Sequence, residues 1–141
     1  MKPSPAADDT RGPARRGDRG HPSAPAPTTA SGARDRVSAL LQCAGVSLDT
    51  VTAADALLVT SELVTNAIRH GGGVTAFHAD IADDALYLSV SDGHPRFPYP
   101  RTAVPGHPGG YGWPLIQRLT ERVDVSSHSG GKTVAVVLRL L

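Results

Sequence analysis

Hydrophobic residues recur at three- and four-residue steps in the first half of the chain, which is the spacing of helices with one buried face. The first such stretch begins near Ser31, and Gly45 can end it. Its apolar positions are Val37, Leu40, Leu41 and Ala44. The pattern therefore predicts a short amphipathic helix at the start of the folded region.

The second stretch predicts a longer helix, with Thr52 as its N-cap and the glycines at 71–73 as its end. Asp55 follows Thr52 by three residues and completes a pair similar to a capping box. We expect one stripe of this helix to be buried, made of Ala54, Leu57, Leu58, Ser61, Thr65 and Ile68.

Alternation of apolar and polar residues predicts four strands, near 74–81, 85–92, 122–128 and 132–140. The second is the most regular, with Leu86, Leu88 and Val90 as its inward positions and Asp83-Asp84 as the turn before it. A long loop at 93–112 and a helix near 113–120 separate the two strand pairs. This order indicates an α+β fold, a two-layer sandwich with helices on one face of a mostly antiparallel sheet.

Composition divides the 141 residues into a tail and one domain. Residues 1–30 contain no Val, Ile, Leu, Phe, Tyr or Trp, so they cannot bury enough apolar area to offset the entropy of ordering them. We therefore predict a disordered tail over 1–30 and a single domain over 31–141. All 12 prolines lie in two blocks, one in the tail and the other at 95–114, around the long loop.

Charge and cysteine content exclude several classes of protein. No apolar run reaches the roughly 18–20 residues of a membrane span, and the N-terminus lacks the apolar core of a secretory signal. The single cysteine cannot form an internal disulfide, which fits the cytoplasm. Residues 37–141 carry seven basic and nine acidic side chains, unlike a nucleic-acid-binding domain. We expect a cytoplasmic protein that binds neither membranes nor nucleic acid directly.

Three polar residues share one stripe of the second helix: Glu62, Asn66 and His70 are spaced four residues apart. The stripe lies beside the apolar one, so these side chains are expected at the edge of the core. A carboxylate, an amide and an imidazole in a row suit a base, a cation ligand and a phosphate contact. An ordinary solvated helix face has the same spacing.

Three glycine-containing segments add further candidates. Asp92-Gly93 ends a strand, where the carboxylate can accept hydrogen bonds from a planar amine, although Asp-Gly also favours a simple turn. The glycines at 109–112 run into a helix N-terminus, which attracts phosphate. The segment 130–133, Gly-Gly-Lys-Thr, leads into the last strand and equally fits a hairpin turn.

Taken in order, these segments resemble the GHKL nucleotide-binding superfamily. The matching segments are SELVTNAIRHG at 61–71, Asp92-Gly93, GYGWPLI at 110–116 and GGKTV at 130–134. Within the superfamily, the chain is similar to the single-domain anti-sigma-factor serine kinases that are abundant in actinobacteria. The resemblance covers residues 31–141 and implies the GHKL ATP-binding fold.

The resemblance implies a role for each residue at the phosphate end of the site. Asn66 matches the ligand of Mg²⁺, and Glu62 matches the general base of the catalytic members. Gly110 and Gly112 match the second glycine box, which forms the phosphate-cradling end of the nucleotide lid. His70 matches a position often filled by a basic or polar neighbour of the phosphates.

The resemblance also implies how the base is bound. Asp92 matches the aspartate that accepts a hydrogen bond from the adenine amino group, and Gly93 lets the base approach the backbone. Thr133 matches the hydroxyl that supports this aspartate, directly or through water. The first glycine box departs from the usual pattern, because His94 and Pro95 follow Gly93 without a second glycine.

The resemblance implies an ATP- and Mg²⁺-binding regulator. Such a protein phosphorylates a serine of an anti-sigma-factor antagonist and sequesters a sigma factor, and its relatives often form homodimers. One alternative is a non-catalytic module whose partner binding is gated by nucleotide. A detached histidine-kinase catalytic domain is a third reading, for which the sequence offers no phosphoacceptor helix pair.

Overall fold

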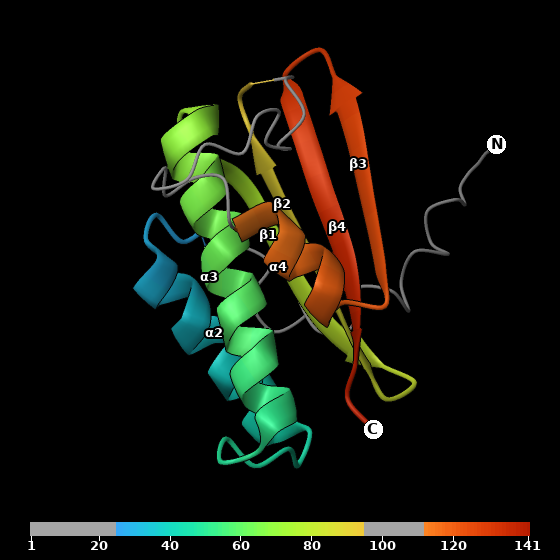
Figure 1. The fold of residues 1–141 in the computed structure, drawn as a ribbon. Helices are drawn as coiled ribbons and strands as arrows, with labels where there is room; N and C mark the ends of the chain where they lie inside the picture. Colours follow the sequence, from blue (N-terminus) through green and yellow to red (C-terminus); the bar gives the residue numbers. More distant parts are fainter. Residues whose placement is uncertain (1–24, 95–111) are drawn as a thin grey trace, which may run out of the picture.

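The computed structural model describes residues 25–94 and 112–141. Residues 1–24, which make up most of the predicted tail, and Gly110 of the predicted lid lie outside this part of the chain, so those predictions stay predictions. The elements follow the order α2 (Ala30–Cys43), α3 (Val51–Gly71), β1 (Val74–Ala82), β2 (Ala85–Asp92), α4 (Gly112–Leu119), β3 (Arg122–His128) and β4 (Gly131–Arg139) (Figure 1). The α+β class predicted from the alternating and helical patterns is confirmed.

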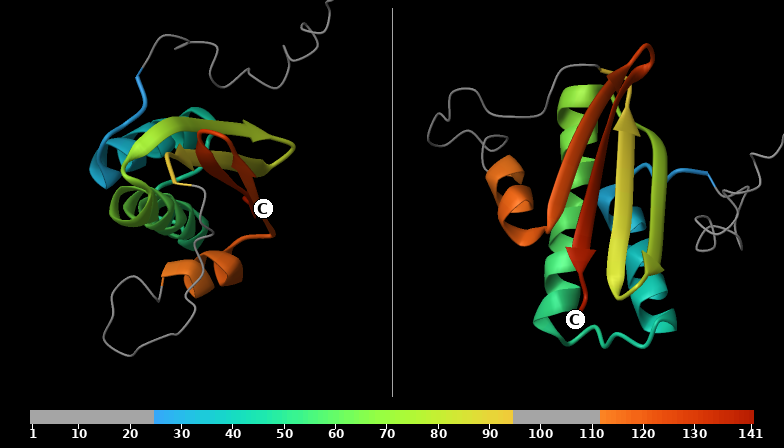
Figure 2. Two further views of the ribbon diagram at one scale, coloured as in Figure 1. Left: turned by 90° about the horizontal axis from the view of Figure 1, so that it is seen from above. Right: turned by 90° about the vertical axis from the view of Figure 1, so that its right-hand side faces the viewer.

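The four strands form one antiparallel sheet in the order β1-β2-β4-β3. Helices α2 and α3 lie together behind this sheet when it is viewed from the strand side (Figure 2, right). The central neighbours β2 and β4 are separated in the sequence by α4 and β3. Their pairing places the end of β2 beside the start of β4, where Asp92 is opposite Lys132.

The core lies between the sheet and the helices. Strand β2 shows the expected alternation, because Leu86, Leu88 and Val90 are buried while Tyr87 is exposed. Strand β4 buries Val134, Val136 and Leu138 on the same face. Since side chains alternate along a strand, the residues two positions beyond these, Asp92 and Lys132, also face the helices.

Helix α3 buries a different stripe from the one predicted. Leu58 and Ile68, which were expected in the core, are 41% and 43% exposed. The buried residues are Ala53, Ala56, Val59, Thr60, Leu63, Val64, Ala67 and Gly71. The helix carries apolar residues on neighbouring stripes. The buried stripe contains three alanines, and their small side chains let the helix backbone approach the neighbouring elements closely.

The N-terminus of α3 also differs from the prediction. The N-cap is Thr50 rather than Thr52, and its hydroxyl oxygen accepts a hydrogen bond from the Ala53 N–H at 3.2 Å. The C-terminus agrees with the prediction, since Gly72 adopts a left-handed conformation at φ 81°. By length and composition α3 could cross a membrane, a test that core helices of globular domains also pass. Here it packs against α2, α4 and the sheet.

The turn between β1 and β2 predicts a stabilising substitution. Asp83 and Asp84 both have positive φ, 51° and 61°, as a two-residue hairpin turn of type I′ requires. Glycine adopts this conformation without the steric cost that aspartate bears. We expect Asp84→Gly to raise the free energy of unfolding by roughly 0.5–1 kcal/mol, measured by urea denaturation. A lower urea midpoint would contradict this reading of the turn.

Candidate functional site

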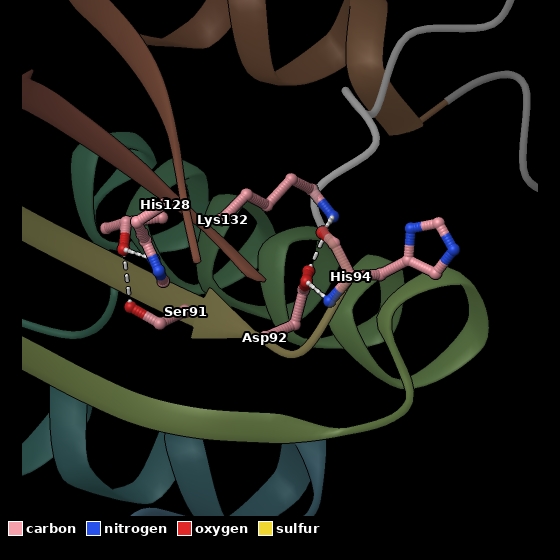
Figure 3. Close-up of polar contacts among 6 residues, drawn as sticks. Ser91, Asp92, His94, His128 and Lys132 are labelled. Atoms are coloured by element: carbon pink, nitrogen blue, oxygen red, sulfur yellow. Dashed lines mark hydrogen bonds and ion pairs between the residues drawn. The ribbon is translucent and has the colours of Figure 1, made fainter. Parts of the chain in front are cut away.

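Asp92 lies at the end of β2 and is buried, with 3% of its surface exposed. Its Oδ2 atom pairs with the Nζ of Lys132 at 2.6 Å, and its Oδ1 atom accepts a hydrogen bond from the backbone N–H of His94 at 2.8 Å (Figure 3). The carboxylate is therefore fixed from two sides. An oriented carboxylate with free lone pairs is what recognition of an amino group requires.

Two glycines make room for Asp92. Gly71, the last residue of α3, lies so close that an added Cβ would overlap the Asp92 carboxylate. Gly131, at the start of β4, has φ of 142°, and its Cβ would overlap the Asp92 backbone carbonyl. The Gly93 N–H donates to the Gly71 carbonyl at 3.1 Å, which ties the end of β2 to the end of α3. These contacts define one end of the site.

The structure does not bring Thr133 to Asp92, which corrects the supporting role predicted for it. The Thr133 hydroxyl lies 2.7 Å from the Ser91 hydroxyl and 3.2 Å from Nε2 of His128. Thr133 pairs with Ser91 in the sheet, whereas Lys132 pairs with Asp92. Because neighbouring residues of a strand face opposite sides, Thr133 lies on the face away from the helices and Lys132 supports Asp92.

The other end of the site lies where α4 meets α3. Gly112, the first residue of α4, is buried, and an added Cβ there would overlap Oε1 of Glu62 and lie 3.7 Å from Oδ1 of Asn66. Glu62 and Asn66 are both half-buried, as expected for the edge of the core. The structure therefore brings together three of the predicted phosphate-end residues.

His70 and Gly93, the other two predicted site residues of the described chain, are both exposed. His70 is exposed in the last turn of α3, one residue before Gly71. Gly93 is also exposed, and among the described residues an added Cβ would meet the Gly71 carbonyl oxygen alone, at 3.7 Å. The exposure of Gly93 is compatible with a ligand approaching the backbone there, and both roles stay predictions.

The two ends of the site are connected by a single helix. Gly71, which contacts Asp92, follows Glu62 by nine residues on α3, a rise of about 13–14 Å. An acceptor for an amino group thus lies at one end of α3 and a carboxylate–amide pair further along it. This separation is of the order of the length of a nucleoside triphosphate.

The residues at the α4 end fit a magnesium ion. Mg²⁺ takes oxygen ligands and is usually held by one or two protein groups together with phosphates and water. Asn66 Oδ1 and Glu62 Oε1 are oxygen atoms that both lie beside Gly112. Within residues 25–94 and 112–141, no group of three or more His, Cys, Asp or Glu side chains could hold a metal ion.

The sequence patterns did not predict the positions of Lys132, Gly71 and Gly131 in the site. The signal for Lys132 was present in β4, where Val134, Val136 and Leu138 share a face with position 132. The roles of Gly71 and Gly131 depend on contacts between distant segments, which local patterns do not reveal.

Comparison with known families agrees with this fold. Residues 23–138 match the family model of the histidine kinase-like ATPase domain. The chain belongs to this family and so to the GHKL superfamily, which confirms the resemblance at that level. No curated protein matches the sequence.

A solved structure has a similar fold. It is the histidine kinase domain of the blue-light activated histidine kinase from Erythrobacter litoralis EL346, with a TM-score of 0.50 and 20% sequence identity. The match covers 84% of this chain and 66% of that chain. At this identity the likeness shows a shared fold.

Proposed function

We propose that the protein binds ATP with Mg²⁺ and transfers the γ-phosphate to a serine of a partner protein. From the motifs of this chain, we infer that the partner is an anti-sigma-factor antagonist and that the same domain sequesters a sigma factor. Membership of the histidine kinase-like ATPase family supports ATP binding. The finer role rests on the resemblance of SELVTNAIRHG and the later glycine segments to anti-sigma-factor serine kinases. The cytoplasmic location and the homodimer stay predictions.

The arrangement along α3 is the observation that carries this proposal. Asp92 lies against Gly71 at the helix C-terminus, while Glu62 and Asn66 lie beside Gly112 further back along the helix. Adenine bound at Asp92 would therefore have its phosphates directed along α3 toward Asn66. The N-terminus of α4 begins beside these two side chains, and helix N-termini favour phosphate.

Each side chain then has a chemical task. Asp92 accepts a hydrogen bond from the amino group of the base, and Asn66 offers an oxygen to the cation. Glu62 accepts the proton of the serine hydroxyl as that oxygen attacks the γ-phosphorus, while the bond to the bridging oxygen of ADP breaks. When bound, Mg²⁺ neutralises negative charge on the phosphates.

The direct test combines the purified chain with γ-labelled ATP, Mg²⁺ and candidate antagonist proteins. We expect label on a serine of one antagonist. Pull-downs from native cytoplasm with and without ATP and Mg²⁺ would identify the partners. Nucleotide binding without label transfer to any retained partner would favour the non-catalytic module over the kinase.

Asp92→Asn should weaken ATP binding by about tenfold or more, because the Asn amide cannot match a carboxylate as an acceptor. Isothermal titration calorimetry measures this at a temperature where circular dichroism shows a folded variant. Asp124→Asn is the matched control, since Asp124 is exposed and pairs with Arg122 on β3. Unchanged ATP affinity in folded Asp92→Asn would rule out Asp92 as the base contact.

A further inference from the structure

Lys132 is an unusual residue for the position that it occupies. Its side chain is 3% exposed and its partner, the Asp92 side chain, is 5% exposed, so the ion pair is removed from water. It lies at the proposed base-binding end of the site, between the end of β2 and the start of β4 (Figure 3). The two exposed ion pairs of the described residues, Arg122–Asp124 and Arg139–Glu121, lie away from that point.

Stability alone gives a poor account of this pair. Removing two charges from water is costly, and apolar residues of similar volume are often as stabilising as a buried ion pair or more so. The neighbouring positions on the same face of β4, Val134 and Val136, are filled by such residues. A charged pair at the end of this apolar row therefore points to a role in recognition.

The pair also retains hydrogen-bonding capacity. A lysine ammonium has three N–H donors. Among the described residues, Lys132 contacts Asp92 Oδ2 at 2.6 Å and the His94 carbonyl at 3.4 Å, the second being a long contact. From the part of the chain that the structure describes, each Asp92 oxygen accepts one hydrogen bond, and a carboxylate oxygen has a second lone pair. A donor and an acceptor therefore lie side by side.

We propose that Lys132 and Asp92 together read the edge of the adenine base, which makes Lys132 a specificity-determining residue. Asp92 accepts from the exocyclic amino group, while the Lys132 ammonium donates to the adjacent ring nitrogen, N1. A donor next to an acceptor is complementary to these two neighbouring atoms of adenine. The proposal rests on the proposed binding of ATP and extends it from Asp92 to a second base contact.

The test titrates the full chain, with Mg²⁺, against ATP and two analogues. In 1-deaza-ATP a C–H replaces N1, and purine riboside triphosphate lacks the amino group. We expect the wild type to bind each analogue about tenfold more weakly than ATP, the loss of roughly one charge-assisted hydrogen bond in each case. In Lys132→Met the preference for ATP over 1-deaza-ATP should fall to about onefold, while the preference for the amino group remains.

Two further variants make the result interpretable. Lys132→Met leaves Asp92 buried without its cation, so the double variant Asp92→Asn/Lys132→Met removes both charges and should also bind ATP and 1-deaza-ATP equally. Arg139→Met is the control, because it removes an exposed cation from the same strand. It should keep the wild-type preference for ATP over 1-deaza-ATP.

The outcomes separate this proposal from the one on which it rests. If Lys132→Met weakens ATP and 1-deaza-ATP by the same factor, Lys132 only supports the structure and the proposal is overturned. The same conclusion follows if the wild type does not distinguish the two nucleotides. If the wild type binds none of the three, the proposed function itself fails.

Discussion

Gly71→Ala is expected to lower the affinity for ATP about 100-fold while the protein still folds. Gly71 is buried at the end of α3, and a methyl group there would overlap the Asp92 carboxylate. Asp92 cannot move aside freely, because Lys132 and the His94 N–H hold its two oxygens. Overpacking of this kind costs about 1–3 kcal/mol of stability, and it displaces the group that receives the base. Calorimetric titration and thermal unfolding measure the two effects.

Gly130→Ala is the matched control for this substitution. Gly130 is in the hairpin beside the site, and among residues 25–94 and 112–141 an added Cβ would have only Nδ1 of His128 within 4 Å, at 3.8 Å. We expect wild-type affinity and nearly wild-type stability. If Gly71→Ala bound ATP as tightly as Gly130→Ala, the contact between α3 and Asp92 would have no part in the site.

The strands could be predicted well from the sequence because their signal is local. In β2 each inward apolar residue is followed by an outward polar one, and burial follows that alternation. The turn before it needs two residues that tolerate positive φ, and Asp83-Asp84 supplies them. Both features depend on residues that are adjacent in the chain, so no knowledge of distant contacts is needed.

The phase of α3 could not be predicted in the same way. Leu57, Leu58 and Val59 are consecutive, so the apolar residues spread over more than half of the helix circumference and fit several stripes. Which stripe is buried depends on how closely α2, α4 and the sheet approach. The alanines at 53, 56 and 67 permit the close approach, and that preference is a property of tertiary packing.

In the candidate site, too, some features could be predicted from local sequence and others depend on tertiary contacts. Glu62, Asn66 and Asp92 could be selected from their motifs. The structure places the first two beside Gly112 and the third at the end of β2, and their roles stay predictions. The assignment of Thr133 was wrong by one residue, and in a strand such a step reverses the face. The buried residues Val134 and Val136 indicate the correct parity for Lys132, although its pairing with Asp92 depends on β2 and β4 being neighbours.

Glu62→Gln is expected to reduce phosphate transfer by about 10²–10⁴-fold, the range for loss of a general base, and to leave ATP affinity within about threefold. Glutamine keeps the size of the side chain beside Gly112, where there is no room for an added methyl group. It cannot take a proton from the attacking serine hydroxyl. Label transfer to the antagonist measures the rate, and calorimetric titration measures the affinity.

Glu121→Gln is the control, since Glu121 lies just before β3, is half-exposed and pairs with Arg139 at the end of β4. It should leave both rate and affinity unchanged. The comparison also separates the two roles open to a carboxylate at position 62. If Glu62 is the base, Glu62→Gln lowers the rate of phosphate transfer and leaves ATP affinity nearly unchanged. If Glu62 is a cation ligand, the same substitution also removes the Mg²⁺-dependent part of the ATP affinity. If Glu62→Gln transferred phosphate at the wild-type rate, another group would have to accept the proton, and the assignment of Glu62 as the base would be wrong.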